Sequence, residues 1–299
     1  MKEFASLYEL FEAIPDEQAA INYFKAIRWA HGEFCAYCGH DKVYELKGGK
    51  AWKCAQCRQR FSMRIGTIFE DSKIPIRKWM AAIWFITSHR KGIASAALAR
   101  DIDVTQKTAW FMLHRLRHAA RTRTFNRKLR GTVEVDEGYF GGKEGNKHKA
   151  KRGKTKKALA VGLLERGGEL RVLPIKSTMQ MYTAVLDHVS KDARLMTDEA
   201  RVLASLDEDY NRIAVNHSKG QYGDGRDGHT NSMEGLWALI KRQIYGIHHF
   251  VSPKHLHRYF DEAVWRYNRR TLKDRYRVTE FLGRVDGRLT YKTLIAKNA

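Results

Sequence analysis

Residues 132–137, with the sequence Thr-Val-Glu-Val-Asp-Glu, decide the fold class of this 299-residue chain. Apolar and polar side chains alternate along them, which is typical of a half-buried β-strand, and Asp136 stands near the strand's end. Further strands are predicted at 157–164, 169–175, 194–197 and 213–215, with helices near 180–189 and from Thr230 onward. The order β-β-β-α-β-α-β-α predicts an antiparallel meander that α/β units extend into a mixed five-stranded sheet, which is the ribonuclease H-like arrangement.

Three carboxylates occupy special positions in that order. Asp136 lies late in the first strand, Asp198 directly follows the fourth, and Glu234 lies in the last helix. Lys241 follows Glu234 by two helical turns, so the two share a face. Carboxylate oxygens suit Mg²⁺ and Mn²⁺, and two such ions can assist phosphodiester cleavage. We therefore expect Asp136, Asp198 and Glu234 to hold two catalytic Mg²⁺ or Mn²⁺ ions and Lys241 to contact a DNA phosphate.

Three other acidic residues compete for these roles. They are Glu134, Glu137 and Glu199. Glu137 is expected on the opposite face of the strand from Asp136, because successive side chains in a strand alternate. Glu199 falls outside its strand. An Asp at a strand end is often only a turn residue and a helical Glu is usually solvated, so the prediction depends on three carboxylates fitting one topology.

The four cysteines predict a metal site. Cys35, Cys38, Cys54 and Cys57 form two Cys-x-x-Cys pairs separated by 15 residues, with a Gly-Gly turn between them. This spacing is typical of a zinc ribbon, in which four thiolates close the coordination shell around one structural Zn²⁺. Two disulfides are the alternative, which a reducing cytosolic environment disfavours.

A helix-turn-helix is predicted after the ribbon. A helix begins near Pro75, a short helix spans 95–100, a turn spans 101–104, and Thr105 is a plausible N-cap of a second helix. The start of such a second helix enters a DNA major groove. We expect base contacts from Gln106, Lys107 and Thr108, and phosphate contacts from Arg115 and Arg117.

The charge of the chain favours a polyanionic partner. Lys and Arg number 55 against 33 Asp and Glu, a formal net charge of +22. Nucleic acid is the first candidate. The basic run at 143–157 is predicted to form a DNA clamp near Asp136, through residues such as Lys151, Arg152 and Lys154; a solvated loop is the default alternative. No apolar run is long enough to span a membrane, and no signal peptide is visible.

Several motifs together resemble one family. They are the cysteine ribbon followed by RFSMRIGTIFEDSKIP at 60–75, VEVDEGYFGGKE at 133–144, LMTDEA at 195–200, HTNSMEGLWALIKR at 229–242 and YFDEAVWRYNRR at 259–270. The chain resembles DDE-type insertion-sequence transposases with an N-terminal zinc ribbon, the ISXO-type group, over roughly residues 12–272. The resemblance places the family's triad on Asp136, Asp198 and Glu234 and its basic helix residue on Lys241, with Asn231 as an adjunct.

The resemblance also implies an activity. Such enzymes bind the element's terminal inverted repeats, hydrolyse the DNA at the transposon end with divalent metal, and transfer the freed 3′-OH into target DNA. It further implies a homodimer or higher multimer on DNA, in a bacterial cytoplasm and at the nucleoid when bound. Two alternatives stay open: a DNA-binding regulator on an inactive scaffold, and a structure-selective nuclease.

These features divide the chain into five predicted parts. They are an N-terminal helical segment at 1–33, the ribbon at 34–70, the helix-turn-helix at 75–128, the ribonuclease H-like catalytic domain at 129–272 and a basic C-terminal tail at 273–299.

Overall fold

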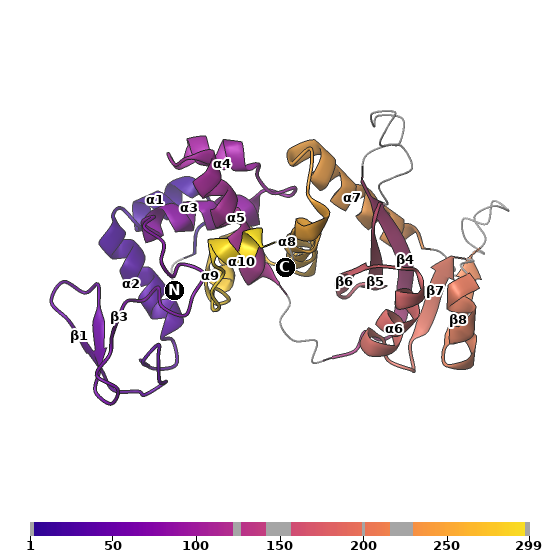
Figure 1. Ribbon diagram of the computed structural model, residues 1–299, viewed down its shortest axis with the longest axis horizontal. Helices are drawn as coiled ribbons and strands as arrows, with labels where there is room; N and C mark the ends of the chain where they lie inside the picture. The colour runs from indigo at the N-terminus through magenta and orange to yellow at the C-terminus, as the bar shows by residue number, and fades with distance from the viewer. Residues whose placement is uncertain (1–2, 122–126, 142–156, 199–200, 216–229, 297–299) are drawn as a thin grey trace. The chain divides into compact units, whose positions relative to one another are not determined.

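A computed structural model describes residues 3–121, 127–141, 157–198, 201–215 and 230–296. The chain divides into two compact units (Figure 1). Residues 1–121 and 270–299 make up the first unit, and residues 122–269 make up the second. In the part of the chain that the structure describes, no helix has the length and apolar character that crossing a membrane requires.

The first unit combines helices with a small antiparallel sheet. Its elements are α1 (Leu7–Ala13), α2 (Glu17–Arg28), β1 (Val43–Glu45), β2 (Trp52–Cys54), β3 (Arg60–Phe61), α3 (Ile76–Ser88), α4 (Ser95–Asp101), α5 (Gln106–Ala120), α9 (Asp274–Leu282) and α10 (Tyr291–Ile295). Strands β1 and β2 pair antiparallel on either side of the Gly-Gly turn between the two Cys-x-x-Cys pairs. Helices α4 and α5 confirm the two predicted helices around a turn. The Thr105 cap is also confirmed, since the Thr105 hydroxyl accepts a hydrogen bond from the Thr108 backbone N–H.

Residues 274–295 fold back into the first unit, where the sequence predicted only a basic tail. Helix α9 buries Val278, Phe281 and Leu282, and the Tyr23 hydroxyl lies 2.7 Å from the Thr279 hydroxyl. The high content of Lys and Arg in this segment obscured these three apolar residues, which lie at helical spacing.

The second unit is built on one mixed sheet with the strand order β6-β5-β4-β7-β8. Its elements are β4 (Thr132–Phe140), β5 (Ala158–Glu165), β6 (Leu170–Ile175), α6 (Met179–His188), β7 (Arg194–Asp198), the 3₁₀ helix η3 (Arg201–Glu208), β8 (Asn211–Val215), α7 (Asn231–Ile247), the 3₁₀ helix η5 (Pro253–His255) and α8 (Leu256–Asn268). Strands β4, β5 and β6 pair antiparallel, whereas β7 runs parallel to both β4 and β8. The predicted ribonuclease H-like sheet is confirmed.

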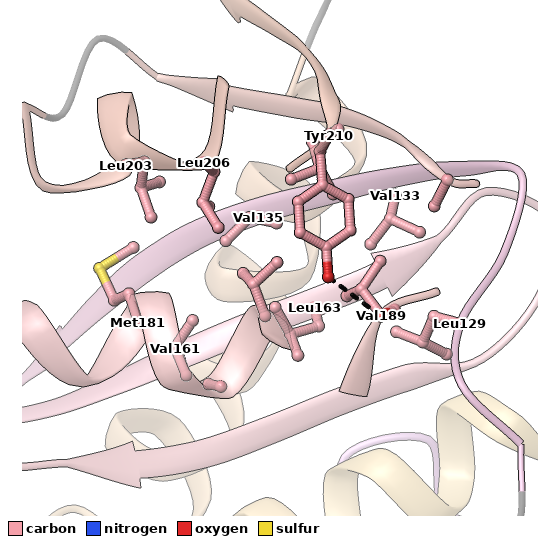
Figure 2. Close-up of a cluster of buried hydrophobic side chains, with 14 residues drawn as sticks. Leu129, Val133, Val135, Val161, Leu163, Met181, Val189, Leu203, Leu206 and Tyr210 are labelled. Atoms are coloured by element: carbon pink, nitrogen blue, oxygen red, sulfur yellow. Dashed lines mark hydrogen bonds between the residues drawn. The ribbon is translucent and has the colours of Figure 1, made fainter. Parts of the chain in front are cut away.

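The two faces of this sheet bury different cores. On one face Val133 and Val135 of β4 pack with residues of α6 and η3 and with Tyr210 (Figure 2). The Tyr210 hydroxyl donates a hydrogen bond of 3.2 Å to the Val189 carbonyl. On the other face Phe140 packs with residues of α7 and α8. The alternation of β4 therefore directs Glu134, Asp136 and Gly138 toward the face that carries α7.

Candidate metal and nucleic-acid sites

The four cysteines meet at one point of the first unit. Their sulfur atoms all lie within 4.8 Å of one another, with Cys35 Sγ 3.7 Å from Cys57 Sγ and Cys38 Sγ 3.6 Å from Cys54 Sγ. These distances exclude disulfides, and the cysteines are free thiols. The arrangement is consistent with a structural zinc site.

Backbone N–H groups donate hydrogen bonds to two of these sulfurs, which favours the thiolate form that binds a cation. The Tyr37 N–H points at Cys35 Sγ and the Cys57 N–H points at Cys54 Sγ, each at 3.4 Å. Burial disfavours the Cys54 thiolate, but hydrogen bonds from neighbouring backbone and thiol groups outweigh it and lower the pKa of Cys54 to about 6. The thiolate is the form that binds metal, so this donor set fits Zn²⁺.

The ribbon is anchored to helix α2. The Trp52 ring of β2, 1% exposed, packs edge-on against Trp29 with ring centroids 5.3 Å apart. The Arg28 guanidinium donates to the carbonyls of Met63 and Ile65. Part of the segment that the sequence left without a role, residues 1–33, therefore supports the ribbon.

An acidic cluster lies where the pairing between the parallel strands β4 and β7 stops. Strand β4 itself continues to Phe140, so Asp136 lies in mid-strand, which corrects the prediction that it stands near the strand's end. Oxygens of Asp136, Glu137 and Asp198 lie within 4.8 Å of one another, and all three residues are half-buried. Burial and the charges of Glu137, Asp198 and Glu234 raise the pKa of Asp136 from 3.8 to about 7. Burial and the charge of Asp198 also raise the pKa of Glu137. Crowded carboxylates that resist ionisation are the donor set that a divalent cation stabilises.

The structure corrects the prediction that Glu137 points away from Asp136. The β4–β7 pairing ends at Val135 and Thr197, so β7 no longer flanks the edge of β4 beyond that point. A Glu side chain is long enough to reach around such an edge, and the Glu137 carboxylate joins the other two. Alternation along a strand fixes the direction of the Cβ atom and leaves the far end of a long side chain free.

Helix α7 carries Glu234 beside this cluster. Glu234 lies exposed in the first turn, and its charge contributes to the raised pKa of Asp136. Lys241 lies half-buried two turns further along the helix. The helix approaches the sheet closely because Gly162, the cross-strand partner of Asp136, has no side chain: a Cβ atom there would lie 2.3 Å from Met233 Cε.

Glu134 has a role that the sequence did not disclose. Its side chain is fully buried, accepts a 2.7 Å hydrogen bond from Arg166 Nε, and accepts a 2.8 Å hydrogen bond from the Met233 backbone N–H. It therefore belongs to the support of α7 rather than to the metal-binding oxygens. The available signal was its spacing of two residues from Asp136, which places both side chains on one face of the strand.

The start of α5 presents polar groups to solvent. Gln106 and Lys107 are exposed and Thr108 is half-buried. The Gln106 amide donates to the Ser95 hydroxyl of α4 at 2.8 Å, and Lys107 Nζ lies 5.3 Å from the centre of the Tyr291 ring of α10. The side chains predicted to face DNA bases are thus on the surface of the first unit.

Arg115 and Arg117 are not available for the phosphate contacts that the sequence predicted. They are 5% and 1% exposed. Arg115 donates to the carbonyls of Leu289 and Ile68 at 3.1 and 2.9 Å, so it joins the C-terminal segment to the segment between β3 and α3. Helical periodicity could not reveal this, because Leu289 is 174 residues away.

Four residues of the sequence prediction lie outside the described residues. They are Lys151, Arg152 and Lys154 of the predicted DNA clamp, together with Glu199.

Comparison with known proteins gives two family matches. Residues 128–268 match the ISXO2-like transposase domain, and residues 15–60 match the transposase zinc-ribbon domain. An uncharacterized protein in transposable element ISH50 of Halobacterium salinarum is 30% identical over 249 residues, which cover 76% of this chain and 83% of that protein. This relative is archaeal, so the comparisons do not support the predicted bacterial source.

One solved structure, the pre-cleavage Mos1 transpososome, aligns with 68% of this chain and 78% of its own. The sequence identity is 11% and the TM-score is 0.23, which is too low a similarity to bear on the fold.

Proposed function

Because the chain belongs to the ISXO2-like DDE transposase family of insertion sequences, we propose that it cuts DNA at the ends of such an element and joins the freed end to target DNA. The observation that carries this proposal is the acidic cluster. Asp136 and Asp198 come from two neighbouring parallel strands, each directly after the last residue of their pairing, and the charge of Glu234 on α7 reaches Asp136. Clustered carboxylates at such a site suit metal-dependent phosphodiester chemistry.

Asp136, Asp198 and Glu234 would hold two Mg²⁺ or Mn²⁺ ions. When bound, such ions supply Lewis-acid stabilisation of the charge on the attacking and leaving oxygens. The carboxylates would hold the ions in place, and their own repulsion of the DNA phosphate would be offset once cations are bound. Lys241 would hold a DNA phosphate on the same helix. Water and then a DNA 3′-OH act as nucleophiles, so the chain forms no covalent intermediate with DNA.

Glu137 and Glu234 are distinguishable as the third carboxylate. Glu137 lies within the oxygen cluster, whereas Glu234 acts on Asp136 through its charge. We assign the catalytic role to Glu234, because the resemblance places the family's third acidic residue there and because its charge reaches Asp136. Under this assignment Glu234→Gln abolishes strand cleavage, and Glu137→Gln leaves a measurable rate. The reverse order of the two rates would move the assignment to Glu137.

The first unit would recognise the DNA. Gln106, Lys107 and Thr108 at the start of α5 would read bases in the major groove of the terminal inverted repeats. The basic run at 143–157 would clamp DNA beside the catalytic site. One Zn²⁺ per chain would stabilise the ribbon, and synapsis of two DNA ends calls for a dimer or larger assembly on DNA.

A cleavage assay tests the proposal. Labelled duplexes that carry the element's own terminal repeat are incubated with Mg²⁺ and either the wild-type chain or Asp198→Ala. We expect a nick at the repeat boundary with wild type and none with the variant. The same result with wild type and with Asp198→Ala would favour a DNA-binding regulator. Cleavage that occurs only on branched DNA, whether or not it carries the repeat, would favour a structure-selective nuclease.

A further inference from the structure

The first turn of α7 is tied to the strand that carries Asp136. Met233 is the third residue of this helix, and its backbone N–H donates to Glu134 Oε2 at 2.8 Å. Helix N-termini leave such N–H groups without partners inside the helix, and a side chain just before the helix usually accepts from them. Thr230, the N-cap residue, supplies no side-chain cap hydrogen bond. The Met233 N–H is shared between the Thr230 backbone carbonyl, at 3.0 Å, and this shorter contact to β4, 99 residues away in the sequence, which takes the place of a side-chain cap.

The acceptor itself is held in place. The other oxygen of Glu134 lies 2.7 Å from Arg166 Nε, and Arg166 follows the end of β5 with its own backbone N–H bonded to the Thr132 carbonyl at 2.9 Å. A carboxylate with both oxygens engaged has little rotational freedom. Because Glu134 is fully buried, these charge-assisted hydrogen bonds are also strong.

The side chain of Met233 adds a second restraint at the same residue. It is fully buried and occupies the space above Gly162, directly across from Asp136. Backbone and side chain of Met233 are thus both fixed to the sheet. Glu234 is the next residue, so its position relative to Asp136 is set by Met233.

We propose that Glu134 is a positioning residue for the acidic site: with Arg166 it clamps the first turn of α7 and so sets where Glu234 stands relative to Asp136 and Asp198. This inference rests on the proposed metal-binding role of those three carboxylates. Glu134 touches neither cation nor DNA. Partners that orient metal ligands typically change metal affinity by about 10- to 100-fold when they are replaced.

The test uses the full-length chain and Mn²⁺ as the probe. Mn²⁺ affinity is measured by calorimetry for wild type, Glu134→Gln, Glu234→Gln and the double variant. We expect Glu134→Gln to weaken binding by about 10- to 100-fold in the wild-type background and to have no further effect once Glu234 is replaced. Unchanged Mn²⁺ affinity in Glu134→Gln, or an equal loss in both backgrounds, would overturn the proposal.

Glu165→Gln is the matched control. Glu165 also binds an arginine, Arg127, and a backbone N–H, that of Arg130, in the same unit but outside the acidic cluster. Its replacement should leave Mn²⁺ affinity unchanged, and a loss equal to that of Glu134→Gln would show a general structural effect and overturn the proposal. Arg166→Gln is a second variant for the case in which Glu134→Gln does not fold, and the same dependence on Glu234 is expected with a smaller loss.

Amide hydrogen exchange separates this inference from the proposed function, because it needs no metal. Glu134→Gln should speed exchange at the Met233 and Glu234 amides and leave the rest of α7 protected. Unchanged exchange there would overturn the clamp even if Mn²⁺ binds. Faster exchange in a chain that binds no Mn²⁺ would support the clamp and contradict the proposed metal site.

Discussion

At the scale of single residues, Asp136 makes stability depend on pH. Its pKa rises from 3.8 to about 7 on folding, chiefly by burial and by the charge of Glu137, so the folded state binds more protons than the unfolded state between these values. The contribution of Asp136 to the free energy of unfolding therefore falls as pH rises from about 4 to 7 and then levels.

Asp136→Asn should remove this dependence. In buffer free of Mg²⁺ and Mn²⁺, urea denaturation should show the variant gaining stability over wild type at pH 8 and not at pH 4. A stability difference between the two proteins that does not change with pH would contradict the raised pKa.

Gly162 lets α7 pack closely on the sheet, because it has no side chain. Its added Cβ in Gly162→Ala would lie 2.3 Å from Met233 Cε and 2.8 Å from Trp237 Cζ2. We expect a loss of about 1–3 kcal/mol in unfolding free energy, measured by denaturation, because a packed core must shift. Gly235→Ala is the control: nothing lies within 4 Å of its Cβ, and alanine in a helix should gain up to about 1 kcal/mol. Equal stability of the two variants would refute the close fit.

At the scale of elements, two basic residues of α5 should behave differently. Lys107 is exposed at the start of the helix, so Lys107→Ala should weaken DNA binding and reduce its salt dependence by about one counterion. Arg115 is buried with carbonyl partners, so Arg115→Ala should instead destabilise the first unit by about 2 kcal/mol or more. Fluorescence anisotropy over a salt series measures the effect on DNA binding, and thermal denaturation measures the effect on stability. If Lys107→Ala lost stability and Arg115→Ala did not, the two roles would be contradicted.

Local patterns in the sequence predicted which helices and strands form, but they did not predict the contacts that those elements make. The cysteine spacing, the Thr105 cap and the alternation of β4 are properties of a few neighbouring residues, and the structure confirms the elements they predicted. The burial of Arg115 and the clamp by Glu134 depend on partners 174 and 99 residues away. No local pattern encodes such partners, and the reach of Glu137 around a strand edge likewise depends on where the neighbouring strand stops.

At the scale of the whole molecule, the C-terminal segment completes the first unit. Deletion of residues 270–299 removes the buried side chains Val278, Phe281 and Leu282 and the Leu289 partner of Arg115. Each buried apolar side chain contributes about 1.5–3 kcal/mol, a large share of a typical domain's total of about 5–15 kcal/mol. The truncated chain should lose the thermal transition of its first unit and retain that of the second. Two intact transitions in calorimetry would contradict this division.

The central claim is that the site formed by Asp136, Asp198 and Glu234 cleaves DNA through divalent cations in contact with the scissile phosphate. The most direct measurement places a phosphorothioate of defined configuration at the cleavage position of a terminal-repeat duplex. Sulfur is a poor ligand for Mg²⁺ and a better one for softer ions. For one of the two configurations, we expect cleavage to slow in Mg²⁺ and recover in Mn²⁺ with the wild-type chain, and to be absent in both with Asp198→Ala. Equal rates in Mg²⁺ and Mn²⁺ for both configurations, or full activity of Asp198→Ala, would contradict the claim.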